Sequence, residues 1–285
     1  MVSPESEDDG PLYGSDAAEA LRRREASRAK DSDEKFALLL AAVRAGGRCR
    51  RLVDIGCGWG QFLAKVAEAL PAVELWGVDE SPERLKDAAG ACARARVVLC
   101  RADRLALPDA HFDVAVASQV LHELKLFGRP GELAGALAEA RRVLVPGGRF
   151  LLLDHLDAGD GEVTVRLPPP ARARLAEFER KFRCYEAAHE DLPGGAVRIT
   201  RRCLQDFLTK DWSLGTAMEP MEMAETHNVF RREETEALLA SRGLEVLAWQ
   251  SFADIRADLR RAGGQLVEGA PWFRKFLSSA IAILM

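Results

Sequence analysis

The segment RLVDIGCGWGQF, Arg51–Phe62, decides the fold of this chain and the kind of ligand it holds. An apolar run leads into three glycines, Gly56, Gly58 and Gly60, and Asp54 lies two residues before the first of them. A short apolar run bounded by glycines is typical of a buried strand. Because ligands of open parallel sheets bind beyond the carboxyl ends of the strands, the glycine loop is the predicted ligand site.

The chain beyond this loop alternates between short apolar runs and helical patterns, which predicts a parallel sheet covered on both faces. The predicted strands are 51–55, 73–79, 96–100, 112–118, 149–155 and 244–250. The predicted helices are 15–45, 60–70, 82–92, 131–144, 171–190, one starting at 200, and 231–241. The sequence therefore predicts an α/β doubly wound fold, broken after the fifth strand by an insertion of about 70 residues.

Four segments follow from this pattern. Residues 1–12 are acidic and contain two prolines, so we expect a disordered tail. Residues 13–155 hold the N-terminal helices and the ligand-binding core, residues 156–226 a helical lid, and residues 227–285 the remainder of the core sheet. Three consecutive prolines, Pro168 to Pro170, mark the insertion, since they cannot lie inside a sheet or a helix.

Composition and charge exclude several classes of partner. The 285 residues carry a formal charge of only −4, which does not indicate a nucleic-acid or membrane surface. No apolar run approaches the roughly 20 residues of a membrane span. The six cysteines have no CxxC spacing and are interpreted as reduced thiols of a cytoplasmic protein.

The spacing of the glycines and the charge of Asp54 argue against a dinucleotide. A G-x-G-x-x-G motif counted from Gly56 requires glycine at position 61, which is Gln61, since the third glycine comes one residue early. Asp54 would also repel a pyrophosphate. A ligand with a cationic amine at this end, such as S-adenosylmethionine, reverses the sign of that interaction, and its carboxylate can bind N–H groups of the helix N-terminus.

Two further acids end neighbouring strands. Asp79 follows the second strand, where a carboxylate can accept both ribose hydroxyls, and Asp103 follows the third, within reach of an adenine amino group. Each acid alone is equally well explained as a helix cap or a turn residue. One cationic nucleoside explains all three together.

Four motifs in order resemble those of class I S-adenosylmethionine-dependent methyltransferases of the small-molecule type: VDIGCGWG, GVDES, RADRLALPDAHFDVAVASQVLHEL and RRVLVPGGRFLLLDH. The resemblance covers about residues 35–155 and resumes at 230–250. It implies a seven-stranded sheet whose last strand is antiparallel and includes SSAIAILM. It also implies that the cofactor is bound by Tyr13, Asp54, Gly56, Cys57, Gly58, Gly60, Asp79, Glu80, Asp103, Arg104, Ser118 and Gln119. Among these, Cys57 is expected to fill a small space with its N–H facing the cofactor, and Tyr13 is expected to close over the cofactor.

The acceptor is expected to enter from the side of the insertion. Three histidines are candidate general bases there: His122 after the fourth strand, His155 at the end of the fifth, and His227 before the core resumes. Their spacing supplies no local pair of metal ligands, so no metal site is predicted.

These observations favour a methyltransferase that acts on O, N or C of a small molecule, such as a secondary metabolite. Alternatives are a cofactor-binding protein of the same fold with a cyclase-like or partner-subunit role, or a methyltransferase acting on RNA or protein. The mild charge, and SQVL in place of an Asn-Pro-Pro-Tyr-like tetrad after the fourth strand, disfavour the macromolecular substrates. A nicotinamide oxidoreductase is disfavoured by Gln61 and Asp54.

Overall fold

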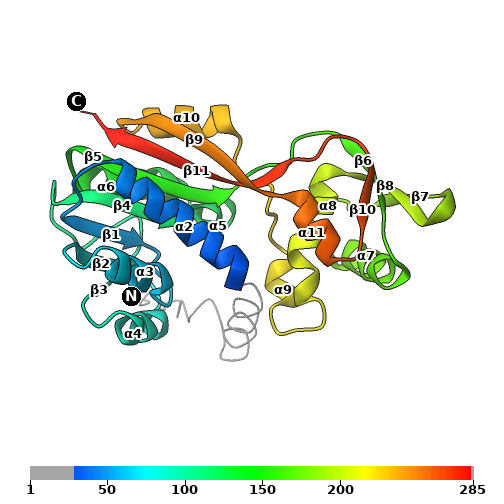
Figure 1. The fold of residues 1–285 in the computed structure, drawn as a ribbon, viewed down its shortest axis with the longest axis horizontal. Coiled ribbons are helices and arrows are strands. Elements are labelled where there is room, and N and C mark those ends of the chain that lie inside the picture. Colours follow the sequence, from blue (N-terminus) through cyan, green and yellow to red (C-terminus); the bar gives the residue numbers. More distant parts are fainter. Residues whose placement is uncertain (1–28, 284–285) are drawn as a thin grey trace, which may run out of the picture.

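The computed structural model describes residues 29–283, with side chains from residue 34 onward. Its main sheet has seven strands in the order β3-β2-β1-β4-β5-β11-β9 (Figure 1). The strands are β1 (Arg51–Ile55), β2 (Glu74–Asp79), β3 (Arg96–Leu99), β4 (Phe112–Ser118), β5 (Leu144–His155), β9 (Leu244–Asp254) and β11 (Phe273–Ala282). The first five pair in parallel, and β11 lies antiparallel between β5 and β9, which confirms the predicted fold class.

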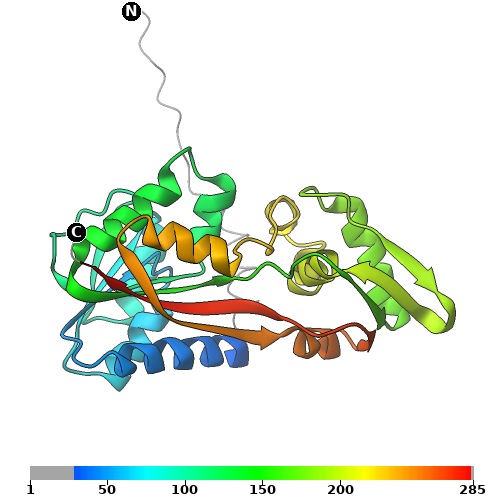
Figure 2. The ribbon, with the colours of Figure 1, turned by 90° about the horizontal axis from the view of Figure 1, so that it is seen from above.

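Helices cover both faces of this sheet (Figure 2). The helices α2 (Ala29–Ala45), α3 (Gln61–Ala69) and α4 (Pro82–Ala91) share one hydrophobic cluster, and α5 (Leu121–Phe127), α6 (Glu132–Val143) and α10 (Arg232–Ala240) share the other. Successive residues of a strand enter opposite clusters, as Leu52 and Val53 of β1 do. The continuous apolar runs therefore reflect strands that are buried on both sides.

The insertion contains strands as well as helices, whereas the sequence predicted a helical lid. A second sheet has the order β10-β6-β8-β7, with β6 (Glu162–Arg166), β7 (His189–Leu192), β8 (Ala196–Thr200) and β10 (Gln265–Glu268). Its helices are α7 (Pro169–Lys181), α8 (Arg201–Lys210), α9 (Glu219–Glu222) and α11 (Ile255–Arg261). Because β10 and α11 come from beyond residue 227, the chain returns to the insertion before β11 completes the main sheet.

Helix α7 is shorter than the predicted helix 171–190. Pro169 and Pro170 begin it, where a missing N–H costs least, but Phe182 already has an extended backbone. Tyr185 lies outside the helix and packs edge to face on Phe182, with ring centroids 4.9 Å apart. Its spacing from the aromatic residues of the helix is why the sequence predicted a longer helix. Helix α8 starts as predicted, because the Thr200 side chain accepts the N–H of Cys203.

Candidate active site

The glycine loop after β1 is held close to its neighbours by residues that tolerate no side chain. Gly56 and Gly60 both have positive φ, and a Cβ on Gly60 would lie 2.8 Å from the Cα of Ala88 in α4. The N–H groups of Gly56 and Cys57 both donate to the carbonyl of Val78. The expectation that the Cys57 N–H faces a ligand is therefore wrong, because β2 already accepts it.

Asp54 is the least satisfied polar group of this loop. Its side chain is 3% exposed, and its Oδ1 has no hydrogen-bond partner in the described part of the chain. Burial raises the pKa of Asp54 to about 7, while nearby Lys35 opposes that rise. A buried carboxylate oxygen without a donor fits a ligand that brings its own cation or N–H group.

The acids at the next two strand ends are already engaged. Asp79 accepts the N–H of Gly58 through Oδ2 and the N–H of Ser81 through Oδ1, both at 2.9 Å. Asp103 accepts Arg101 Nε at 3.0 Å, and the same arginine lies 3.8 Å from Glu80. Arg101 also pairs with the buried Glu132. Sequence reasoning missed this arginine, which pairs with three acids at this edge and offsets part of their charge.

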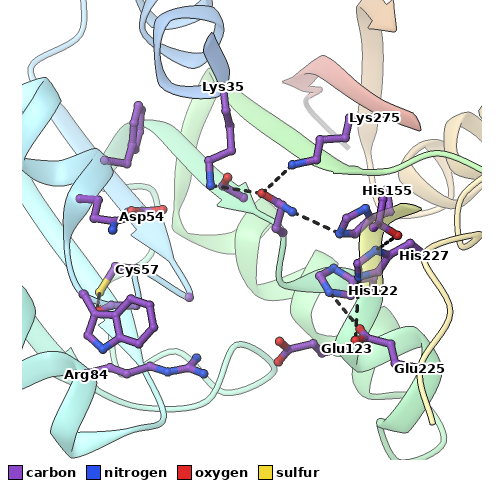
Figure 3. A pocket seen from close by; sticks show the side chains of 18 of the residues that line it. Lys35, Asp54, Cys57, Arg84, His122, Glu123, His155, Glu225, His227 and Lys275 are labelled. Atoms are coloured by element: carbon purple, nitrogen blue, oxygen red, sulfur yellow. Dashed lines mark hydrogen bonds and ion pairs between the residues drawn. The ribbon is translucent and has the colours of Figure 1, made fainter. Parts of the chain in front are cut away.

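One cavity of about 230 Å³ joins the glycine loop to the insertion (Figure 3). Of the predicted site residues it brings together Asp54, Gly56, Cys57, Gly58, Ser118, Gln119, His122, His155 and His227. Gly60, Asp79, Glu80, Asp103 and Arg104 are not among its lining residues, and Tyr13 lies outside the described residues. The lining also includes residues that the sequence did not single out for the site, notably Lys35, Trp59, Arg84, Thr209, Glu222, Glu225 and Lys275.

His122 lies between two carboxylates from different parts of the fold. Its Nδ1 is 2.7 Å from Asp154 Oδ1 in β5, and its Nε2 is 3.3 Å from Glu225 Oε1 in the insertion. These two carboxylates outweigh burial and hold the pKa of His122 well above its usual value. His122 is therefore an imidazolium with both N–H groups engaged, a poor proton acceptor.

His155 is neutral and its tautomer is set by Gln119. The Oε1 of Gln119 accepts Lys35 Nζ and Lys275 Nζ, each at 3.1 Å, so its amide nitrogen faces His155 Nε2 at 3.1 Å. That nitrogen donates, which leaves the proton of His155 on Nδ1. Burial, followed by the charge of His122, holds the pKa of His155 well below its usual value.

His227 closes the cluster from the insertion side. Its Nδ1 is 2.9 Å from the hydroxyl oxygen of Thr209, and that hydroxyl donates to the carbonyl of Gln205. His227 Nδ1 therefore donates, and in the neutral ring Nε2 carries the lone pair. Nε2 is 4.0 Å from a carboxylate oxygen of Glu225. This geometry leaves His227 as the candidate proton acceptor among the three histidines.

A buried lysine anchors the acidic side of the cluster. Lys210 is 0% exposed, and its Nζ lies 2.8 Å from Glu222 and 3.3 Å from Glu225. Lys210 and His122 hold the pKa of Glu225 down at about 2 against the effect of burial. Lys210 lies in the helix that the sequence predicts to start at 200, whereas the two glutamates lie in the acid–methionine segment 218–225, which has no regular periodicity.

Two groups of buried side chains have donor atoms close enough for a metal ion: His122, Asp154 and His155, and Glu222, Glu225 and His227. Several of these donor atoms already take part in hydrogen bonds or ion pairs among the described residues. Lys210 bridges the two glutamates, and the Nδ1 of His122 pairs with Asp154. The expectation that the protein holds no metal stays a prediction, which these hydrogen bonds favour.

Known proteins resemble the part of the chain that contains the glycine loop. Residues 53–152 match the family model of the methyltransferase domain. The chain is 33% identical over 141 residues to demethylmenaquinone methyltransferase of Deinococcus radiodurans, which is 48% of this chain and 49% of that protein. It is also 33% identical over 124 residues to the ubiquinone/menaquinone biosynthesis C-methyltransferase UbiE of Burkholderia mallei, covering 42% and 47% of the two chains. The matches thus span about half the length of these curated relatives.

Solved structures show the same fold at low identity. A SAM-dependent methyltransferase from Methanosarcina mazei aligns with a TM-score of 0.50 and 18% identity, covering 86% of this chain and 98% of that one. The N-methyltransferase NodS from Bradyrhizobium japonicum aligns with a TM-score of 0.50 and 13% identity, covering 89% and 97%. No helix in residues 29–283 is long and apolar enough to cross a membrane.

Proposed function

We propose that the protein, whose residues 53–152 match the family model of the methyltransferase domain, transfers a methyl group from S-adenosylmethionine to O, N or C of a small molecule. The observation that carries the proposal is the single cavity that joins the glycine loop to the histidine cluster. A donor and an acceptor held in one cavity lose little further entropy on reaction, which is the main requirement of displacement at an activated sulfonium.

The donor end of the cavity fits this cofactor. The orphaned Oδ1 of buried Asp54 suits the α-ammonium of the methionine end. We assign the ribose hydroxyls to Asp79 and the adenine amino group to Asp103, whose present partners are backbone N–H groups and Arg101. When bound, the cofactor supplies the reactive methyl group, and the chain supplies its position.

The acceptor end fits an acceptor that gives up a proton. We assign the role of general base to His227, whose Nε2 accepts the proton as the new bond to the methyl carbon forms. Glu225, at 4.0 Å, stabilises the imidazolium that results. His122 stays charged and positions Glu225, and the Gln119 amide orients His155.

Ring carbons of quinone precursors are a second candidate class of acceptor. The observation that favours them is the 33% identity to two relatives named as quinone-pathway methyltransferases. Met218 and Met221 add adaptable apolar surface to the acceptor end. Demethylmenaquinone offered as acceptor tests this candidate.

The experiment that tests the proposal measures binding first and turnover second. We expect S-adenosylhomocysteine to bind in a calorimetric titration. We further expect S-adenosylhomocysteine to accumulate, by mass spectrometry, when S-adenosylmethionine is supplied with a panel of phenols, amines and quinols. Binding without turnover of any acceptor would favour the alternative of a non-methylating cofactor protein. Absence of binding would contradict the proposal.

A further inference from the structure

We infer that Asp206, a buried carboxylate in α8, is a positioning residue that holds the proton acceptor His227 in place for turnover. Asp206 is 0% exposed and is not among the residues that line the cavity, whereas His227 is. Asp206 serves the base of the proposed function, on which the inference rests. It acts through His227 rather than on the acceptor itself.

The first observation is that His227 lies in a stretch without regular structure. Residues 225–229 belong to neither a helix nor a strand, although the ring of His227 faces the cavity beside the other two histidines (Figure 3). Side chains of α8 hold it instead. Its N–H donates to Asp206 Oδ1 at 2.6 Å, and its carbonyl accepts Gln205 Nε2 at 3.0 Å. Its Nδ1 donates to the hydroxyl oxygen of Thr209 at 2.9 Å. One turn of α8 therefore fixes both the main chain and the ring.

The second observation is that Asp206 binds three consecutive residues at once. Besides the N–H of His227, its carboxylate accepts the Thr226 hydroxyl at 2.7 Å and Asn228 Nδ2 at 2.9 Å, both through Oδ2. The Tyr185 hydroxyl donates to the same oxygen at 2.8 Å. Burying a carboxylate is costly, and four donated hydrogen bonds offset that cost. Three of the four come from the segment that carries the base.

The consequence for the reaction follows from these contacts. A base displaced by about 1 Å can lower the rate by about a hundredfold, because proton transfer requires close alignment in the transition state. Loss of the Asp206 carboxylate moves the main chain of His227 and weakens the bond between Nδ1 and Thr209, but it removes no group that lines the cavity. We therefore expect kcat to fall and KM for the acceptor to stay unchanged.

The test uses two hydroxyls that donate to the same oxygen of Asp206. Thr226→Val and Tyr185→Phe each remove one of them, but only Thr226 adjoins His227. Thr226→Ser keeps the hydroxyl and is the rescue variant, and Asp206→Asn removes the charge and one oxygen. Initial rates are measured with the acceptor that the panel of phenols, amines and quinols identifies. Nitrogen-15 NMR shows which nitrogen of the neutral His227 ring carries the proton, and urea unfolding gives the stability.

We expect Asp206→Asn to lower kcat by about ten- to a hundredfold with KM within about twofold, and to divide the His227 proton between the two nitrogens. Thr226→Val and Tyr185→Phe should lose similar stability, since each removes one hydrogen bond to the same oxygen. Only Thr226→Val should lower kcat, by about five- to tenfold, and Thr226→Ser should restore it to within about twofold.

Two results overturn the inference. One is a kcat that falls equally in Thr226→Val and Tyr185→Phe, which is the mark of a merely structural carboxylate. The other is an unchanged kcat in Asp206→Asn. If Asp206→Asn does not fold, the two hydroxyl variants decide alone. Absence of turnover in the wild type contradicts the proposed function instead, and the NMR comparison then decides: a proton fixed on Nδ1 in Thr226→Val as in the wild type overturns the inference.

Discussion

The imidazole rings of His155 and His227 stack face to face, with centroids 3.9 Å apart and planes inclined by 5°. His155 ends β5 of the main sheet, whereas His227 follows the insertion, so the stack joins the two parts of the chain at the cavity. Because the pKa of His155 is held well below its usual value, its ring stays neutral. His227 can therefore gain a proton without facing a second charge in the stacked ring.

We predict that His227→Gln lowers kcat by about 10²- to 10⁴-fold for an acceptor that must lose a proton, because the variant has no basic nitrogen at that position. The affinity for S-adenosylhomocysteine should stay within about twofold. Initial rates and calorimetry check the two quantities. His111→Gln, outside the cavity, is the control, and an undiminished kcat in His227→Gln would assign the base elsewhere.

Cofactor affinity should rise with pH through Asp54. Its pKa of about 7 in the free protein means that a basic solution supplies the ionised carboxylate that attracts the α-ammonium. We expect the affinity for S-adenosylhomocysteine to increase about tenfold between pH 6 and pH 8. Titrations across this range should give a flat profile for Asp54→Asn. The same slope in the variant would mean that another group is responsible.

The same substitution should stabilise the free protein in basic solution. The folded-state pKa of Asp54 lies above its unfolded value, so the folded form binds the proton more tightly. Stability from this group is present below about pH 4 and is lost as the pH rises toward 7. Asp54→Asn removes that loss. Urea unfolding at pH 8 should therefore show a variant more stable by about 2 kcal/mol, whereas a less stable variant would refute the burial argument.

His122 and Asp154 form a buried ion pair that stabilises the folded protein most at low pH. A carboxylate whose pKa is lowered on folding has the opposite effect and stabilises most at high pH. The pKa of His122 is raised, so the stabilisation is fully present below about pH 6.5 and is lost only as the pH passes the folded-state pKa, well above neutrality. Asp154→Asn should cost about 3–5 kcal/mol in unfolding free energy at pH 6, since it leaves a buried charge with one partner fewer.

The measurement is urea unfolding at pH 6, with imidazole NMR shifts as a second readout. The NMR titration should show His122 in the wild type protonated at pH 8, and its pKa lower in Asp154→Asn. Thr164→Ser, a conservative change in β6 away from the cavity, is the control. A neutral His122 at pH 7 in the wild type would contradict the ion-pair description.

Asp79→Ala should weaken the binding of S-adenosylhomocysteine by about 1.5–3 kcal/mol, or ten- to a hundredfold, if its carboxylate accepts the ribose hydroxyls. Asp79→Asn removes the charge but keeps one of the two oxygens that accept the N–H groups of Gly58 and Ser81, so it disturbs the loop less than Asp79→Ala does. Glu68→Ala on the exposed face of α3 is the calorimetric control. Equal affinity in all four proteins would remove Asp79 from the site.

The sequence was sufficient for the main sheet because its strands are buried on both faces and read as continuous apolar runs between glycines and helices. The second sheet was missed although EVTVR, residues 162–166, and AVRIT, residues 196–200, both alternate polar and apolar residues. The prolines and the aromatic repeat beside these runs are typical of loops and helices, and they mask that alternation.

The candidate site also contains some residues that the sequence predicts and others that it does not. Asp54 and the glycines could be predicted because they are contiguous in sequence and follow one strand. Lys275 could not, since it reaches the cavity only through the antiparallel register of β11 and β5, which pairs it with His155. Glu225 reaches His122 only because the insertion folds back on the core, and Lys210 meets Glu225 across 15 residues of the insertion. No local pattern specifies either contact.

The proposed function requires that the carboxylate of Asp54 at the glycine loop binds a cationic nucleoside. A crystal structure of the protein with S-adenosylhomocysteine tests this most directly. We predict the α-ammonium within hydrogen-bonding distance of Asp54 and the thioether sulfur facing His227. A cavity that excludes the nucleoside, or that instead accepts the pyrophosphate of NADH beside Asp54, would contradict the account.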